Sequence, residues 1–242
     1  MRRMLPLREA HRNGTTCVRR VPIFSGLPPE QQDLVAAKAR PMRLARGEVL
    51  HVAGERVGSM FVVHTGQIKL SRTMPSGRNR LLRVAQPGET VGEHAFLSGD
   101  MTEEEATALG DAQLCVFVHE DFAELVDEYP DIALRMLRTL GDRLTRAEKN
   151  LTLGTFGVDV RLADFLLQLP VREGSVGEAG ASGELRVLLP LDKKDIASLL
   201  GTTPESLSRA LSRLSADGLI RVDGDAVTLV DPQALEDRVV EG

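Results

Sequence analysis

The sequence predicts an α+β protein in which an N-terminal antiparallel β-roll or jelly roll, a long helix and a C-terminal winged helix-turn-helix follow one another. Three observations lead to this prediction: short β-rich runs separated by turns, a long stripe of apolar residues at helical spacing, and two short amphipathic segments joined at Gly201. The expected boundaries are an arm over 1–20, the roll over 21–129, the long helix over 130–155 and the winged helix-turn-helix over 156–242.

The N-terminal arm is basic, although the chain as a whole is acidic. The arm contains Arg2, Arg3, Arg8, Arg12, Arg19 and Arg20, whereas the formal net charge of the 242 residues is −5. Hydrophobic residues make up 42% of the chain and charged residues 27%, as in ordinary globular proteins. Because no long apolar run and no secretory h-region follow the basic start, we expect no membrane association and a cytoplasmic location.

The predicted roll consists of short strands between turns. The β-rich runs cover 48–52, 60–64, 67–71, 80–85 and 106–119, and turns fall at Gly54, Thr65-Gly66, Ser76-Gly77 and Pro87-Gly88. Many short strands with turn signals between them are typical of antiparallel rolls. Such a roll can enclose a ligand or offer a face to another domain.

The predicted long helix carries a regular apolar stripe. Its members alternate steps of four and three, which is the spacing of a coiled coil. They are Ala133, Leu137, Leu140, Leu144, Ala147 and Leu151. The stripe can pack on the roll of its own chain, but a helix this long between two compact domains favours a seam between two copies. We therefore expect a homodimer.

Residues 193–214 have the pattern of a helix-turn-helix. Asp192 can cap a first helix, and Gly201 suits the left-handed turn that ends it. Thr203 and Pro204 can then begin a second helix, whose apolar residues recur at helical spacing. Two short β runs over 219–222 and 226–230, joined by an Asp-Gly turn, predict a wing.

The outer face of the second helix carries side chains that can read double-stranded DNA. An arginine can donate two hydrogen bonds to guanine, and a glutamate can accept one from cytosine. We expect base contacts from Glu205, Ser208 and Arg209, and phosphate contacts from Lys193, Lys194, Thr203, Arg213 and Arg221. The alternative is a solvated polar face or a protein-interaction module. The agreement of caps, glycine turn and polar face favours DNA.

In this order the predicted parts resemble the CRP/FNR superfamily of bacterial transcription regulators, over nearly the whole chain from Val21. The most specific parts are 87–99 and 201–213. The Glu205-Ser206-Leu207-Ser208-Arg209 run looks like the Glu-x-x-Ser-Arg pattern of the FNR branch, and Pro204 stands where the CRP branch has its first arginine. The resemblance implies a palindrome of TTGAT-like half-sites, two recognition helices about one DNA turn, roughly 34 Å, apart, and RNA polymerase as a partner.

The same resemblance implies that the roll is a sensor similar to cyclic-nucleotide-binding domains. In those domains a Gly-Glu pair binds the ribose and a later Arg-Ser pair binds the phosphate. Gly92-Glu93, followed by His94, matches the first pair, but 102–105 reads Thr-Glu-Glu-Glu. Because carboxylates repel a cyclic phosphate and this stretch has no arginine, we expect no cAMP or cGMP response and a structural turn at Gly92-Glu93.

The two cysteines offer another signal. Cys17 precedes the roll and Cys115 lies in its last apolar run, and two thiolates are too few for a [4Fe-4S] cluster. The pair resembles that of two-cysteine FNR-like proteins of Gram-positive bacteria, which implies a thiol-disulfide switch. The alternative is that Cys115 is a small buried apolar residue and Cys17 lies on an arm without this role.

Histidines raise a third class of signal, a haem or metal held by His94, His51 or His64. None of these forms a pair with metal-ligand spacing, so we expect no cofactor and no metal, and haem or another small ligand in the roll stays an alternative. The sequence has no nucleophile elbow, phosphate-binding glycine loop or close pair of catalytic carboxylates. We therefore expect no enzymatic activity.

Overall fold

The computed structural model describes residues 18, 19, 21, 24–77, 79–172 and 185–241. The chain forms two compact units, Met1–Leu144 and Thr145–Gly242, which are described separately. Within the described residues, no helix combines the length and the apolar character needed to cross a membrane.

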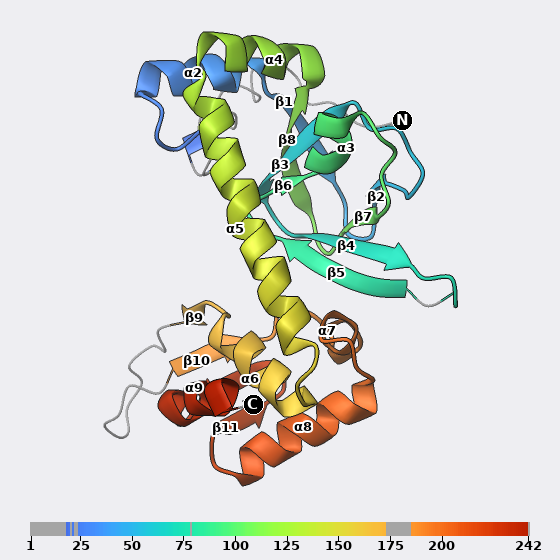
Figure 1. Cartoon of the computed structure of the whole chain (residues 1–242), viewed down its shortest axis with the longest axis vertical. Coiled ribbons are helices and arrows are strands. Elements are labelled where there is room, and N and C mark those ends of the chain that lie inside the picture. The colour runs from blue at the N-terminus through green and yellow to red at the C-terminus, as the bar shows by residue number, and fades with distance from the viewer. Residues whose placement is uncertain (1–17, 20, 22–23, 78, 173–184, 242) are drawn as a thin grey trace. The chain divides into compact units, whose positions relative to one another are not determined.

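The first unit is built on two four-stranded antiparallel sheets (Figure 1). One has the order β1 (Arg40–Leu44), β8 (Ala112–Val118), β3 (Ser59–Thr65) and β6 (Thr90–Val91), and the other the order β2 (Val49–His51), β7 (Glu105–Ala108), β4 (Ile68–Thr73) and β5 (Asn79–Ala85). The predicted antiparallel roll is confirmed.

The central strands β3 and β8 are buried on both faces. On β3, Phe61 and Val63 join the core between the two sheets, while Met60 and Val62 join a second core on the outer face of their sheet. Successive side chains of a strand point to opposite faces, so a strand buried on both sides reads as a continuous apolar run. The apolar runs at 60–64 and 112–118 have this origin.

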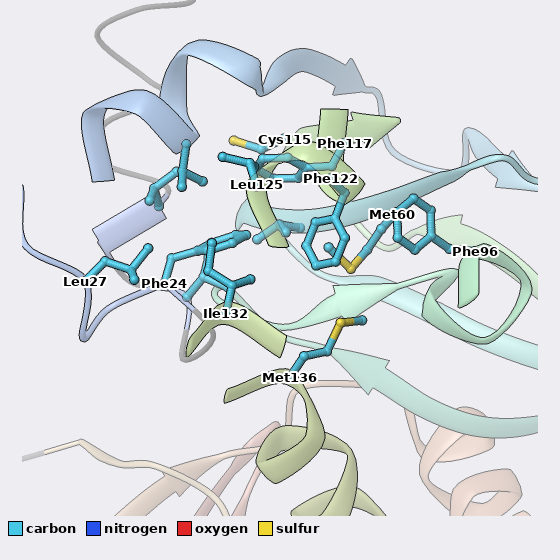
Figure 2. Close-up of a cluster of buried hydrophobic side chains, with 14 residues drawn as sticks. Phe24, Leu27, Met60, Phe96, Cys115, Phe117, Phe122, Leu125, Ile132 and Met136 are labelled. Atoms are coloured by element: carbon cyan, nitrogen blue, oxygen red, sulfur yellow. The ribbon is translucent and has the colours of Figure 1, made fainter. Parts of the chain in front are cut away.

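Helices cover the second core (Figure 2). They are α2 (Pro29–Lys38), α3 (Glu93–Ser98), α4 (His119–Glu128) and the start of α5 (Asp131–Leu153). Phe24, Phe117, Phe122 and Ile132 meet there, and Phe96 stands edge-on to Phe122 with ring centroids 5.4 Å apart. This packing joins the start of α5 to the roll.

The structure corrects the prediction of a single strand over 106–119. The segment forms two strands, β7 and β8, separated by a turn over 109–111, and α4 begins at His119. The sequence pattern does not predict α2, in which only Gln32 and Val35 are buried. Two buried residues in ten make no stripe that stands out from the polar sequence around it.

The second unit is a winged helical domain. It contains α6 (Val158–Leu167), β9 (Val171–Arg172), β10 (Leu185–Leu188), α7 (Lys193–Leu199), α8 (Pro204–Ala216), β11 (Ile220–Asp223), β12 (Ala226–Leu229) and α9 (Pro232–Glu241). The sheet order is β11-β12-β10-β9, and Gly224, with φ 60°, occupies the turn between β11 and β12. The winged helix-turn-helix is confirmed.

Candidate nucleic-acid interface

Local signals set the ends of α7 and α8 as the sequence predicts. The Asp192 carboxylate accepts a hydrogen bond from the backbone N–H of Asp195 at 2.7 Å, and so caps α7. Gly201 then adopts φ 63°, a left-handed conformation that glycine tolerates without a steric penalty. The Thr203 hydroxyl accepts from the backbone N–H of Ser206 at 3.3 Å, which caps α8.

Apolar packing fixes α8 against α7. The inward residues Leu207, Ala210 and Leu214 are fully buried on α8. Ala197 of α7 is also fully buried, and its small side chain permits close packing of the two helices. The opposite face of α8 therefore has a fixed orientation.

That opposite face exposes the predicted base-reading residues Glu205, Ser208 and Arg209. Hydrogen bonds from the backbone N–H of Glu205 and from the Thr203 hydroxyl, with the charge of Arg209, lower the pKa of the Glu205 carboxyl. The carboxylate is thus ionised near neutral pH, as acceptance from a base amino group requires. Arg209 donates from Nη2 to the Ser206 Oγ at 2.9 Å, which holds its guanidinium at the start of the helix.

The predicted phosphate-contacting residues differ in their surroundings. Lys193 and Lys194 are exposed at the start of α7, and Arg221 is exposed on β11. Arg213 instead makes a two-point ion pair with Asp159 of α6, with Nη2–Oδ1 at 2.9 Å and Nε–Oδ2 at 3.2 Å. This pair lowers the pKa of Asp159. A phosphate contact by Arg213 would have to compete with Asp159.

A second cluster of charged groups lies in the roll. Gly92, with φ 80°, forms a turn that begins α3, and His94 is exposed. The Glu93 carboxylate, 14% exposed, pairs with Arg143 of α5 and lies 3.4 Å from Nη2 of Arg83 on β5.

Both arginines also bind the backbone beside Glu93. The carbonyl oxygen of Thr90 accepts from Arg83 at 2.8 Å and from Arg143 at 3.0 Å, and the Thr90 hydroxyl oxygen accepts from Arg143 at 2.8 Å. Burial lowers the pKa of Arg83. The arginines that approach the Gly-Glu pair do not lie in the stretch 102–105 that follows it in sequence. Positive charge reaches Glu93 from β5 and α5 instead.

Comparison with known proteins agrees with this architecture. The model of the cyclic nucleotide-binding domain matches residues 41–129, and that of the Crp-like helix-turn-helix domain matches residues 160–238. A CRP-like cAMP-activated global transcriptional regulator of Mycobacterium tuberculosis is 30% identical over 90% of this chain and 96% of its own length. The chain belongs to the CRP/FNR family of transcription regulators.

Two further proteins are similar to the CRP/FNR chain. The nitrogen fixation regulation protein FixK of Bradyrhizobium diazoefficiens is 30% identical over 81% of each chain. The structure of FixK2 from Bradyrhizobium japonicum shares the fold, with a TM-score of 0.69, 24% identity, and coverage of 82% of this chain and 96% of that chain. The relatives are transcription regulators rather than enzymes, and this CRP/FNR protein is a DNA-binding transcription regulator.

The remaining predicted sensor residues that the structure describes lie on different strands of the CRP/FNR roll. Cys115 is buried in the second core, whereas Cys17 lies outside the described residues. His51 is buried on β2 and His64 is half-buried on β3. In the described ranges, no three His, Cys, Asp or Glu side chains gather in positions that could hold a metal ion.

The predicted seam on α5 divides into two groups. Leu137, Leu144 and Leu151 recur every seven residues and are 64%, 61% and 75% exposed. Leu140 packs against the second core of its own roll, and Ala147 is exposed. The residues predicted for the seam therefore include an exposed leucine stripe and one leucine turned toward the roll.

Proposed function

We propose that this regulator works in the cytoplasm as a homodimer and reads an inverted repeat of TTGAT-like half-sites. Glu205, Ser208 and Arg209 would contact the bases, and Lys193 would be among the phosphate contacts. The observation that carries the proposal is the exposed, capped start of α8, where an ionised Glu205 and a restrained Arg209 stand one turn apart.

The leucine stripe of α5 supports the homodimer. Leu137, Leu144 and Leu151 expose most of their surface on one side of the helix, and burial of such side chains against a second copy is favourable. Two-fold symmetry of the dimer matches the symmetry of an inverted repeat. A dimer bound beside a promoter would then act through RNA polymerase.

Fluorescence anisotropy with labelled duplexes tests the DNA proposal. A duplex with two inverted TTGAT half-sites should bind at least a thousandfold more tightly than a duplex of scrambled sequence at the same salt concentration. The Glu205→Ala and Arg209→Ala variants should bind the scrambled duplex with little change. Each should lose only the part of the preference for the repeat that comes from the base pair it contacts in each half-site. Equal affinity of the unaltered chain for both duplexes would reject the proposed site.

The signal that we propose is not a cyclic nucleotide. The Thr102 hydroxyl donates to the carbonyl oxygen of Val52 at 2.7 Å, and Glu103 pairs with Arg72, so these residues are engaged with the roll itself. Arg83 and Arg143 already pair with Glu93. Because the Mycobacterium relative is described as cAMP-activated, calorimetry with cAMP is the direct test, and tight binding that raises DNA affinity would reject this part.

A thiol-disulfide switch between Cys17 and Cys115 is the second candidate for the signal. Its support is that Val18, directly after Cys17 in sequence, is fully buried in the same core as Cys115. Peroxide treatment should then yield a Cys17–Cys115 peptide pair in mass spectrometry and change DNA affinity, and Cys115→Ser should abolish both effects. A Soret band in the purified protein would favour haem instead.

A further inference from the structure

An open groove in the second unit lies between the start of α7, the outer face of α8 and strand β11. Its volume is about 500 Å³. It is lined by Lys193, Ser208, Leu211, Ser212, Ser215, Ala216 and Val222. None of these residues is acidic, although the chain as a whole carries a formal net charge of −5.

The polar lining offers a cation and a row of hydroxyl groups. Ser208, Ser212 and Ser215 follow one another at steps of four and three, so they form one stripe along α8, and all three are exposed. The Ser212 hydroxyl donates to the carbonyl oxygen of Ser208 at 3.0 Å, and rotation about its C–O bond would free it to donate outward. Lys193 is exposed at the edge of the groove.

The groove continues the base-reading face. Ser208 belongs to both, and Ser215 lies seven residues further along the helix, a rise of about 10 Å. When the start of a recognition helix enters the major groove, the sugar-phosphate strands run along its flanks. A flank with a lysine, three hydroxyls and no carboxylate fits a phosphodiester strand.

We propose that this groove seats one sugar-phosphate strand of the DNA site, with Lys193, Ser212 and Ser215 donating to its phosphates. The inference rests on the proposed function. It adds Ser212 and Ser215 to the interface as positioning residues, which hold the register of α8 on the duplex without reading sequence. It also extends the DNA-facing surface of α8 to Ser215 in its last turn, beyond Arg213, the last residue of this helix for which the sequence predicts a phosphate contact.

A charge introduced into the groove tests the proposal, with anisotropy on the inverted TTGAT duplex and on the scrambled duplex. Ser215→Asp should weaken binding to both duplexes by about tenfold or more, since a phosphate contact is independent of sequence. The matched control is Gln233→Glu on α9, which adds the same charge away from the groove and should change affinity less than about twofold. Thermal unfolding of both variants checks that they fold.

Two further substitutions test the same contacts without introducing a negative charge that could disturb folding. The Ser212→Ala, Ser215→Ala double variant should lose about three- to tenfold in affinity with an unchanged ratio between the duplexes. Lys193→Gln should make the plot of log affinity against log salt concentration less steep, by about one unit of slope per copy of the chain.

The outcomes separate this inference from the proposed function. If Ser215→Asp binds DNA as Gln233→Glu does, or Lys193→Gln leaves the salt slope unchanged, the groove does not hold DNA and the inference is wrong. If the Ser215→Asp variant binds DNA normally but has lost transcription activation, the groove receives a protein partner, and the inference is also wrong. If the unaltered chain binds neither duplex, the proposed function itself fails.

Discussion

Truncation of Leu144 to alanine gives a quantitative test of the dimer seam. The change removes three carbon atoms from each side chain, at about 0.8 kcal/mol for each buried methylene. Leu144 is 61% exposed in the single chain, so only about that fraction of its surface can become buried on association. The expected loss is about 1.5 kcal/mol per copy and about 3 kcal/mol per dimer, which raises the dimer Kd about 150-fold.

Sedimentation equilibrium over a range of protein concentrations measures this Kd directly. The matched control is Leu34→Ala, which makes the same change at a similarly exposed leucine, 50% against 61%, on α2 instead of α5. It should change the Kd by less than about threefold. If Leu34→Ala and Leu144→Ala weaken the dimer equally, or neither does, the leucine stripe is not the seam.

Three further predictions concern specificity and stability. Arg209→Ala should relax specificity at one base pair at a cost of about 1–3 kcal/mol, measured by competition with duplexes altered at each position; a uniform loss at every sequence would indicate misfolding instead. The Arg213 pair depresses the pKa of Asp159, so it stabilises the fold above the carboxyl's unfolded pKa and is lost as pH falls through the lower folded value. Urea unfolding should therefore show Asp159→Asn less stable at pH 7, by no more than about 1 kcal/mol for an exposed pair, and the difference should vanish in acid once the pH is below the folded pKa of Asp159. A difference that grows in acid would contradict this sign. Gly92→Ala should lower the free energy of unfolding by about 1–2 kcal/mol in the same assay, because φ is 80° and a Cβ would stand 3.3 Å from a β3 carbonyl oxygen. The control Gly58→Ala, where a Cβ meets nothing within 4 Å, should cost less. Equal losses for the two variants would contradict the explanation by backbone strain.

The helix-turn-helix was predictable because its signals are local. The caps Asp192 and Thr203, the turn at Gly201 and the buried spacing from Leu207 lie within one short segment, and each acts on its immediate neighbours. The wing followed from an Asp-Gly turn between two β runs. Signals of this kind can be recognised from the sequence because they act between residues that are close together in the chain.

The charged contacts were not predictable from the sequence because they join distant residues. Glu93 meets Arg83 across 10 residues and Arg143 across 50, and Arg213 meets Asp159 across 54. No periodicity or motif marks such pairs, since the fold alone brings them together. The burial of Val18 beside the second core was missed for the same reason, because the arm was interpreted from its charge.

Selection from a library of random DNA duplexes, followed by sequencing of the bound fraction, tests the central claim most directly. The unaltered chain should enrich an inverted repeat of TTGAT-like half-sites whose centres lie about one helical turn, 10 to 10.5 base pairs, apart, and Arg209→Ala should lose the preference at one position in each half-site. Enrichment of a single unrepeated motif, of a direct repeat, or of no sequence at all would contradict the account.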